Sequence, residues 1–333
     1  MLTENELIKI SEICKDKSHI RFTIGTYHDG KIDRYLFGSD GIELPFEKHV
    51  YEIGSITKTF TSTLIAKAIA EKKLFLEDTL NHFLSDLPQD RVYPIIRRLV
   101  THTAGYPTDD EWIRPEELDL FEKDFAFNPY DTVDMERLTE IIISRIVEDK
   151  DYDMAYSNIG VSVMDSVLES IYHKDYDILL QELLDEIGLS DTYLGDQKVN
   201  GNLLCGFTDD NVNTGHFYWK KAGKIKAAGY LFSTADDLLK YAAYLMDEKN
   251  TYLKPCFTKQ NCIGPDMGIC WQLKPDSGFA WHNGGTRSFH SFLCMDTIHK
   301  NAVSILVNYE SGNIEQLGID ILKCLKKDMD TVI

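Results

Sequence analysis

A serine and a lysine three residues apart open a long apolar helix pattern near residue 55. In the stretch EIGSITKTF, Ser55 and Lys58 share one face of the predicted helix, because side chains at positions i and i+3 are neighbours. Burial favours the uncharged form of an amine, so Lys58 could take the proton of the Ser55 hydroxyl and create a nucleophile. The helix is predicted to be buried by an apolar stripe: Phe60, Leu64, Ile65, Ala68 and Ile69.

The start of this helix also suits a developing negative charge. Gly54 allows a sharp turn into the helix, and the N–H groups of the first turn lack partners within the helix. These groups and the positive helix end favour an anion near Ser55. The simpler alternative is that Ser55 only caps the helix and that Lys58 is a solvated lysine of its first turn.

Two further stretches carry groups that could work with this pair. In YSN, Tyr156 could relay protons beside a lysine, and Asn158 could bind the amine or a substrate carbonyl, although a plain helix cap explains the same residues. In WHNGGTRSFHSFL, Gly284 and Gly285 interrupt a strand pattern. An edge strand there could present an N–H group to an oxyanion, and the alternative is a bulge or a tight turn.

The order of the predicted elements indicates an α+β fold. Residues 20–38 predict a β-hairpin, residues 76–225 show helical periodicity, and strand-like runs return over residues 268–310. A helix between the last two regions is predicted to be capped by Ser233, with Asp236 three residues on. We expect one antiparallel β-sheet, built from both chain ends and flanked by helices, with an inserted all-α region and a cleft between the two.

The charge balance argues against anionic partners. Against 54 Asp and Glu, 35 Lys and Arg give a formal net charge of −19, which repels nucleic acid and anionic lipid surfaces. The N-terminal stretch has no secretory signal pattern, and no apolar run is long enough to predict a membrane span. The 7 cysteines include no C-x-x-C pair and indicate free thiols. We therefore expect a cytoplasmic protein without nucleic-acid or membrane partners, whose oligomeric state the sequence leaves open.

Six stretches occur in the order and at the spacing found in a known family: EIGSITKTF, RRLVTHTAGYP, YSNIGVSVMDSVLE, EIGLSDTYLG, AAGYLFSTADDLLKYAAYL and WHNGGTRSFHSFL. Over roughly residues 20–310, the chain resembles the serine β-lactamase-like superfamily. This superfamily includes class C β-lactamases, DD-peptidases, and related esterases and D-aminopeptidases. The resemblance implies an α/β domain from residues 1–78 and 226–333, a helical domain from residues 79–225, and an active site in the groove between them.

The resemblance also implies roles for residues of two of these stretches, EIGSITKTF and YSNIGVSVMDSVLE. Ser55 is expected to be the nucleophile and Lys58 its general base. Tyr156 matches the tyrosine that shuttles protons during acylation and deacylation. Asn158 matches the asparagine that orients the lysine and the substrate. Such a mechanism implies no metal and no organic cofactor.

The last stretch departs from the family pattern. His282-Asn283-Gly284 stands in place of the family's Lys-Thr-Gly, and the N–H of Gly285 is expected to form an oxyanion hole with that of Ser55. In the family, the Lys-Thr pair anchors the carboxylate of penicillins and of peptidoglycan stems. His282 and Asn283 are weaker, pH-dependent partners for such a group. This lowers the expectation of a dedicated β-lactamase or cell-wall carboxypeptidase and favours a broader esterase, amidase or peptidase.

Arg287 stands where relatives usually carry a small residue. Our hypothesis from the sequence is that it restores an anchor for a carboxylate substrate, because a guanidinium binds carboxylates in a bidentate manner. The alternative is a surface arginine paired with an acidic neighbour.

Other candidate motifs add no second chemistry. His102, in THTAGYP, is not expected to be catalytic, because that loop is structural in the family and a lysine base leaves no task for a histidine. The aromatic stretch GHFYWKKAG, residues 215–223, is expected to line the groove or its rim. The chain has no H-E-x-x-H, no G-x-S-x-G and no G-x-G-x-x-G, so metal, α/β-hydrolase and dinucleotide sites lack their signatures.

The sequence therefore predicts a cytoplasmic serine hydrolase that cleaves a small-molecule or peptide ester or amide through a Ser55 acyl-enzyme. The alternatives within this chemistry are a β-lactamase, a DD-carboxypeptidase or a D-aminopeptidase, and an acyltransferase if an alcohol or amine replaces water. From another class, the alternative is an acyl-binding, sensor-like protein that keeps the groove but does not turn over.

Overall fold

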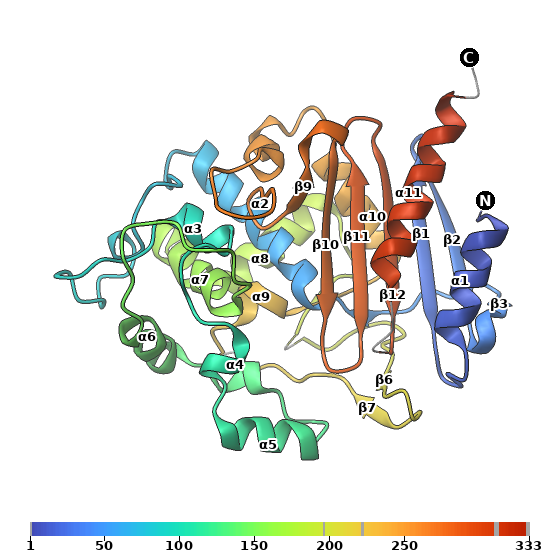
Figure 1. Ribbon diagram of the computed structural model, residues 1–333, viewed down its shortest axis with the longest axis horizontal. Coiled ribbons are helices and arrows are strands. Elements are labelled where there is room, and N and C mark those ends of the chain that lie inside the picture. Colours follow the sequence, from blue (N-terminus) through green and yellow to red (C-terminus); the bar gives the residue numbers. More distant parts are fainter. Residues whose placement is uncertain (1, 196, 221–222, 310–312, 331–333) are drawn as a thin grey trace.

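The computed structural model describes residues 2–195, 197–220, 223–309 and 313–330. A seven-stranded antiparallel sheet lies on one side of the molecule and a group of helices on the other (Figure 1). Both chain ends contribute to the sheet, in the order β3-β2-β1-β12-β11-β10-β9, which confirms the predicted α+β class. Its strands are β1 (Phe22–His28), β2 (Lys31–Phe37), β3 (Glu43–Leu44), β9 (Gln272–Lys274), β10 (Phe279–Gly285), β11 (His290–Asp296) and β12 (Asn301–Val307).

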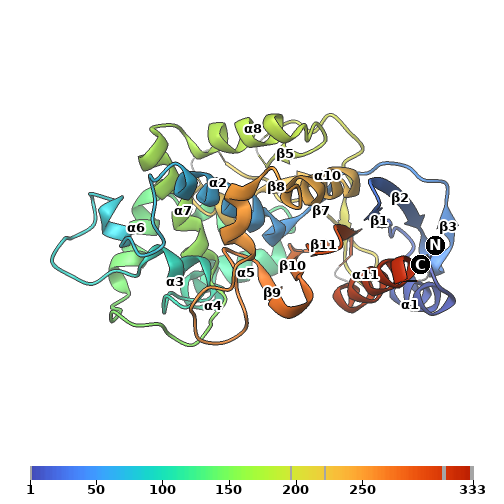
Figure 2. The same cartoon turned by 90° about the horizontal axis from the view of Figure 1, so that it is seen from above.

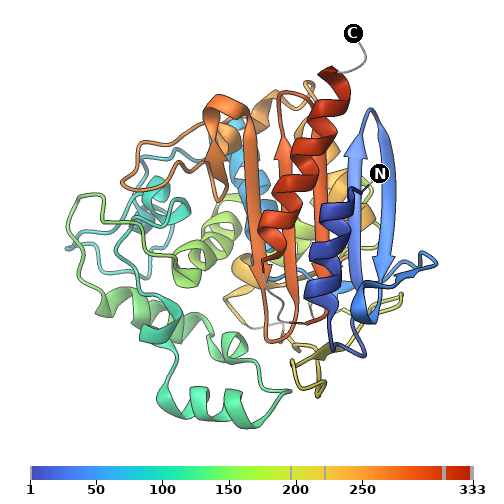
Figure 3. The same cartoon turned by 45° about the vertical axis from the view of Figure 1, so that its right-hand side comes forward.

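Helices cover both faces of this sheet. One face packs against two of them, α1 and α11, which Figure 3 shows side by side, and the other face packs against α10, seen on the opposite side in Figure 2. The helices are α1 (Glu4–Cys14), α2 (Thr57–Ala70), α3 (Ile96–Val100), α4 (Asp109–Trp112), α5 (Pro115–Lys123), α6 (Met135–Ser144), α7 (Asn158–Tyr172), α8 (Tyr176–Ile187), α9 (Lys226–Gly229), α10 (Ala235–Leu245) and α11 (Ile314–Asp330).

The inserted region contains short strands as well as helices. Strand β5 (Tyr193–Leu194) joins β4 (Tyr51–Glu52) and β8 (Leu231–Ser233) in a small three-stranded sheet, and β6 (Gly206–Phe207) pairs with β7 (Asn213–Gly215). The predicted domain boundaries at residues 78 and 225 stay a prediction.

Helix α2 runs through the centre of the molecule and is buried on nearly every side, as its apolar stripe predicts. Phe60 and Ile65 are fully buried, and the ring of Phe60 stacks on that of Tyr241 at 4.0 Å between centroids. Its buried hydroxyl groups are satisfied internally: for example, Thr61 donates to the carbonyl of Ala227 at 2.9 Å. Polar side chains can therefore line the inner end of this helix without the free-energy penalty of unmade hydrogen bonds.

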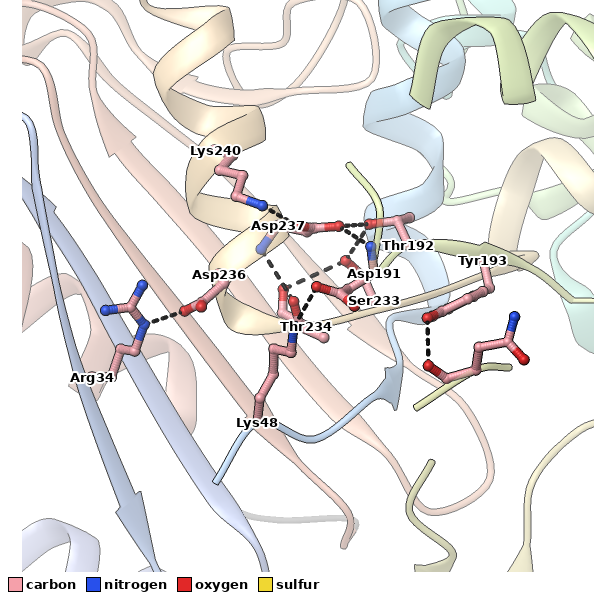
Figure 4. Close-up of polar contacts among 11 residues, drawn as sticks. Arg34, Lys48, Asp191, Thr192, Tyr193, Ser233, Thr234, Asp236, Asp237 and Lys240 are labelled. Carbon is pink, nitrogen blue, oxygen red and sulfur yellow. Dashed lines mark hydrogen bonds and ion pairs between the residues drawn. The ribbon is translucent and has the colours of Figure 1, made fainter. Parts of the chain in front are cut away.

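A polar network fixes the start of α10 (Figure 4). The cap is Thr234, which accepts a hydrogen bond from the N–H of Asp237, and not Ser233 as predicted, because Ser233 is still part of strand β8. The Asp237 carboxylate also accepts from the Asp191 N–H at 2.8 Å, and Lys48 pairs with Asp191. The network joins the helix to the segment before β5.

The predicted hairpin is present as β1 and β2. His28 pairs with Lys31, so Asp29 and Gly30 form a two-residue turn, and both have positive φ angles, 49° and 74°. This is the backbone of a type I′ turn, whose twist matches that of the strands.

The structure bears on the predictions made for the cysteines and for membrane-spanning segments. The seven cysteines are free thiols, and Cys14, Cys256, Cys270 and Cys294 are buried. In the described part of the chain, no helix has both the length and the apolar character needed to cross a membrane.

The contact between Gly54 and Gly285 predicts a stability difference. Gly54 has a φ of +46°, and a Cβ there would lie 2.6 Å from the carbonyl oxygen of Gly285. Gly30 also has positive φ, but a Cβ there would meet nothing within 4 Å. We expect Gly30→Ala to lower the free energy of unfolding by about 1 kcal/mol, from backbone strain alone. Gly54→Ala should cost at least about 2 kcal/mol more, because two backbones must separate.

Urea denaturation of the two variants beside wild type measures this difference. Equal losses in both variants would show that the close approach of the two backbones is not needed.

Candidate active site

The Lys58 amine is enclosed by oxygen atoms at the start of α2. Its Nζ lies 3.0 Å from the Ser55 hydroxyl, 2.6 Å from Asn158 Oδ1 and 2.7 Å from the Ala228 carbonyl oxygen. The Lys58 side chain has no exposed surface, and Ser55 is half-buried. Ser55 lies in a 3₁₀ turn, residues Gly54–Ile56, that leads directly into the helix. The structure therefore brings together three of the predicted site residues.

The chemistry of these oxygens fixes how the amine can bond. Carbonyl oxygens only accept hydrogen bonds, so Lys58 must donate to both Asn158 and Ala228. A hydroxyl can donate or accept. In its uncharged form, the amine gives two N–H groups to the carbonyls and turns its lone pair to the Ser55 hydroxyl. The arrangement suits an amine that removes a proton from Ser55.

Tyr156 lies beside this amine at the start of α7. Lys58 Nζ is 4.9 Å from the centre of the Tyr156 ring, and Tyr156 is 38% exposed. The next residue, Ser157, caps α7 by accepting from the Gly160 N–H at 3.1 Å. Asn158 is the first helical residue, so the structure confirms the cap interpretation for Ser157, whereas the catalytic roles of Tyr156 and Asn158 stay predictions.

The loop around His102 supports this stretch. His102 Nδ1 accepts from the Ser157 N–H at 3.3 Å, its carbonyl accepts from the Ala155 N–H, and its ring lies 4.5 Å from the Tyr156 ring. Burial lowers the pKa of His102 to about 3, helped by the charge of a Lys58 ammonium and by His282. His102 is thus neutral near pH 7 and holds Tyr156 in place, in keeping with the structural role expected of its loop.

His282 faces the same region from β10 but does not behave as predicted. Burial lowers its pKa to about 3, with a smaller effect from a charged Lys58, so it does not titrate near neutral pH. Its Nδ1 lies 2.6 Å from the Asn283 carbonyl oxygen. Since a carbonyl only accepts, Nδ1 carries the proton and Nε2 has a lone pair. His282 is therefore an acceptor, and not the pH-dependent carboxylate partner that the sequence predicts.

Strand alternation turns the next residue away from Ser55. Successive side chains of a strand point to opposite faces, so His282 and Asn283 cannot both face the cleft. Asn283 donates to Glu315 on α11 at 3.2 Å. This placement differs from the predicted contact with substrate.

Arg287 is also directed elsewhere. Its guanidinium lies over the ring of Phe121, 3.7 Å from the centroid, and 5.3 Å from the Phe125 centroid. It donates to the carbonyl oxygens of Phe121 and Asp124, the latter at 3.3 Å. Arg287 thus fastens α5 and the following loop to the turn after β10, which corresponds neither to an anion anchor nor to a simple surface ion pair.

The end of β10 borders the nucleophile through its backbone. Strand β9 pairs with β10 only as far as Trp281, so the edge beyond it has no strand partner among the described residues. A Cβ on Gly54 would lie 2.9 Å from the Gly285 nitrogen, so the two backbones are in contact. Gly284 has no room for a side chain, because a Cβ would meet the Ile53 carbonyl oxygen and the Ser291 hydroxyl. The Gly285 backbone therefore lies against the backbone that leads into Ser55, and its part in an oxyanion hole stays a prediction.

A narrow cleft, open to solvent, has Ser55 among its lining residues. Gly54, Gly229 and Gly285 line it with backbone atoms. The side chains that form its walls are those of Tyr130, Asn158, Phe217, Trp219, Ile225, Ala228 and Thr286. Phe217 and Trp219 belong to the aromatic stretch 215–223, which therefore lines the cleft as expected, although Lys221 and Ala222 of that stretch lie outside the described residues. No sequence motif pointed to Tyr130.

Glu52 is a buried acid behind this cleft that the sequence analysis did not single out. It ends β4, accepts a hydrogen bond from the Phe217 N–H, and is 4% exposed. Burial raises its pKa to about 7, and this outweighs the lowering by the nearby Thr286 hydroxyl and the Phe217 N–H. Glu52 therefore contacts the backbone of one cleft wall and lies beside Thr286 of another. The sequence signal for Glu52 is an acidic residue among apolar residues, just before the start of a helix.

The raised pKa of Glu52 predicts how stability varies with pH. The folded protein keeps the Glu52 proton up to about pH 7, whereas the unfolded chain loses it near the ordinary value of 4.5. The folded state thus binds more protons between these values, and stability falls as pH rises through this window, by on the order of 3 kcal/mol. Glu52→Gln cannot ionise, so its free energy of unfolding should fall less between pH 5 and 8 than that of wild type.

Chemical denaturation across that range checks this, with Glu122→Gln on the exposed side of α5 as the control that keeps the wild-type slope. A Glu52→Gln slope identical to wild type contradicts the assignment.

No cluster of three or more His, Cys, Asp or Glu side chains in the described ranges is arranged to hold a metal ion. The residues around Ser55 are those of acyl chemistry: a hydroxyl, a buried amine, a phenol and backbone N–H groups.

Comparison with known proteins agrees with this arrangement. The β-lactamase family profile matches residues 23–319. A probable fimbrial assembly protein FimD, serogroup H1, from Dichelobacter nodosus is 25% identical over 262 residues, which is 71% of this chain and 60% of that protein. This chain thus spans less than two thirds of that relative's length.

Solved structures share the fold at low identity. The octameric penicillin-binding protein homologue from Pyrococcus abyssi superposes with a TM-score of 0.76 at 18% identity, over 97% of this chain and 76% of that chain. A class C β-lactamase gives 0.74 at 18% identity, over 96% and 93%. With the family profile covering most of its length and this fold around Ser55, the chain belongs to the β-lactamase family.

Proposed function

We propose that this protein is a serine hydrolase that cleaves an ester or amide through a Ser55 acyl-enzyme. The observation that carries the proposal is the Lys58 amine, which is buried, 3.0 Å from the Ser55 hydroxyl, and held by two carbonyl oxygens. Family membership supports the same chemistry, because the family consists of serine hydrolases.

Acylation begins when the Ser55 oxygen attacks the substrate carbonyl carbon. The hydroxyl proton passes to Lys58, and the carbonyl oxygen, now negative, is held by the N–H groups of Ser55 and Gly285. The bond to the leaving group then breaks, and the leaving group takes a proton through Tyr156. The product is an ester between the acyl group and Ser55.

Deacylation uses the same groups in reverse. Water loses a proton to Tyr156 with Lys58, its oxygen bonds to the acyl carbon, and the bond from that carbon to the Ser55 oxygen breaks. Ser55 regains its proton, so one water is consumed per substrate and no other reactant is needed. Asn158 keeps the amine oriented in both halves through its 2.6 Å hydrogen bond.

Matched variants on α2 and in the turn before it test the two central roles. A fluorophosphonate probe should label wild type and not Ser55→Ala, whereas Ser62→Ala, which changes a buried serine of α2, should still be labelled. Lys58→Met should lower kcat/KM for p-nitrophenyl acetate by at least about 10³-fold, because the general base is lost. Lys67→Met, a partly exposed lysine of the same helix, should stay within about twofold of wild type.

Each other result selects an alternative. Labelling of Ser55 without turnover of any ester or amide indicates an acyl-binding protein of the sensor type. Faster turnover of nitrocefin than of esters indicates a β-lactamase, and preference for D-alanyl peptides or D-amino-acid amides indicates a carboxypeptidase or aminopeptidase. Absence of labelling removes the proposal.

A further inference from the structure

Aromatic and aliphatic side chains line the cleft beside Ser55 together with the polar side chains of Asn158 and Thr286. Phe217 is 2%, Trp219 8% and Ile225 1% exposed, so these side chains are held in the interior and show only small parts of their surface to the cleft. A Cβ added to Gly229 would lie 3.9 Å from Trp219 Cη2 and 4.0 Å from the Gly54 carbonyl carbon. The Trp219 ring edge and the backbone that leads into Ser55 therefore both lie close to Gly229.

These rings support one another and form fixed walls. Tyr130 and Trp219 are nearly parallel, 20° apart with centroids at 6.4 Å, and Trp219 meets Tyr230 edge-on at 5.6 Å. Phe217 contacts Tyr130 at 6.3 Å and Phe121 at 6.1 Å between centroids. An apolar group at the cleft would meet aromatic surface that this packing holds in place.

The groups that the sequence offered as carboxylate partners are engaged or uncharged. Arg287 lies against two phenylalanine rings and two backbone carbonyls on the α5 side. His282 is neutral and presents a lone pair, which would repel a carboxylate oxygen. Asn283 faces α11.

The described lysines of residues 217–226, the segment that carries Phe217, Trp219 and Ile225, are paired with acids. Lys220 lies 3.4 Å from Asp131, and Lys226 lies 2.7 Å from Asp177. Lys224 is 2.7 Å from Glu169. An anion entering the cleft would lose its hydration and compete with these ion pairs, on a protein of net charge −19.

We propose that the cleft selects an uncharged, planar apolar acyl group and excludes acyl groups that carry a carboxylate. This inference rests on the proposed hydrolase function and names the substrate class of the same site. It follows from two independent features: fixed aromatic walls beside the nucleophile, and the engagement of each described cation that could pair with a carboxylate there.

Three p-nitrophenyl esters test the proposal: the acetate, the 4-methylphenylacetate and the 4-carboxyphenylacetate. The last two share the arylacetyl skeleton and differ in the para group, which is an uncharged methyl in one and a carboxylate in the other. We measure kcat/KM for each, normalise it to the rate of hydroxide hydrolysis, and work in 0.5 M NaCl so that long-range repulsion is screened. The 4-methyl ester should exceed the 4-carboxy ester by at least about 50-fold and the acetate by about tenfold.

Two tryptophans provide matched variants. Trp219→Ala should reduce kcat/KM for the 4-methyl ester about tenfold more than for the acetate, because only the aryl group reaches the lost wall. Trp281 lies on β10, and its side chain packs against Phe279 on the face of the sheet that is covered by α11. Trp281→Ala should therefore leave the ratio of kcat/KM for the 4-methyl ester to that for the acetate unchanged. Arg287→Ala should change kcat/KM for the 4-carboxy ester and for the 4-methyl ester by the same factor.

The outcomes separate this inference from the proposed function. Equal or faster turnover of the 4-carboxy ester, or a selective loss of it in Arg287→Ala, overturns the selectivity while Ser55 chemistry stands. A Trp219→Ala effect equal on the acetate and the aryl ester also overturns it. If Ser55→Ala still hydrolyses all three esters, the hydrolase proposal itself fails, and the inference fails with it.

Discussion

The site depends on a buried amine placed among carbonyl oxygens. An amine without exposed surface is costly in an apolar interior unless its hydrogen bonds are made, and Asn158 and Ala228 make two of them for Lys58. These two acceptors come from α7 and α9, so the amine also connects both helices to α2, which begins just after Ser55. The bond from Thr61 to the Ala227 carbonyl holds the residue next to Ala228.

The features that could be predicted from sequence were those with local spacing or a fixed chain order. Ser55 and Lys58 share a helix face by spacing alone, and the hairpin and the helices follow from periodicity. That Asn158 meets Lys58 across 100 residues came from the family resemblance, and the 2.6 Å contact shows that the fold brings them together. Their catalytic roles remain the proposal made above.

The predictions that failed concern side-chain direction and environment. Which face of β10 receives His282 depends on the register of the sheet, and once His282 faces Lys58, alternation turns Asn283 to α11. Arg287 lies on the rings of Phe121 and Phe125, which are far away in sequence. Burial is a property of the whole fold, so the low pKa of His282 and the raised pKa of Glu52 have no counterpart in local sequence.

The contact between Gly54 and Gly285 involves backbone only. In the proposed mechanism, backbone N–H groups activate the substrate carbonyl, while the walls that meet the rest of a substrate come from a separate stretch, around Phe217 and Trp219. Substitution of the wall residues can change the substrate selectivity of such a scaffold without any change in the reaction itself. This separation offers a physical reason why one architecture can serve relatives with different substrates.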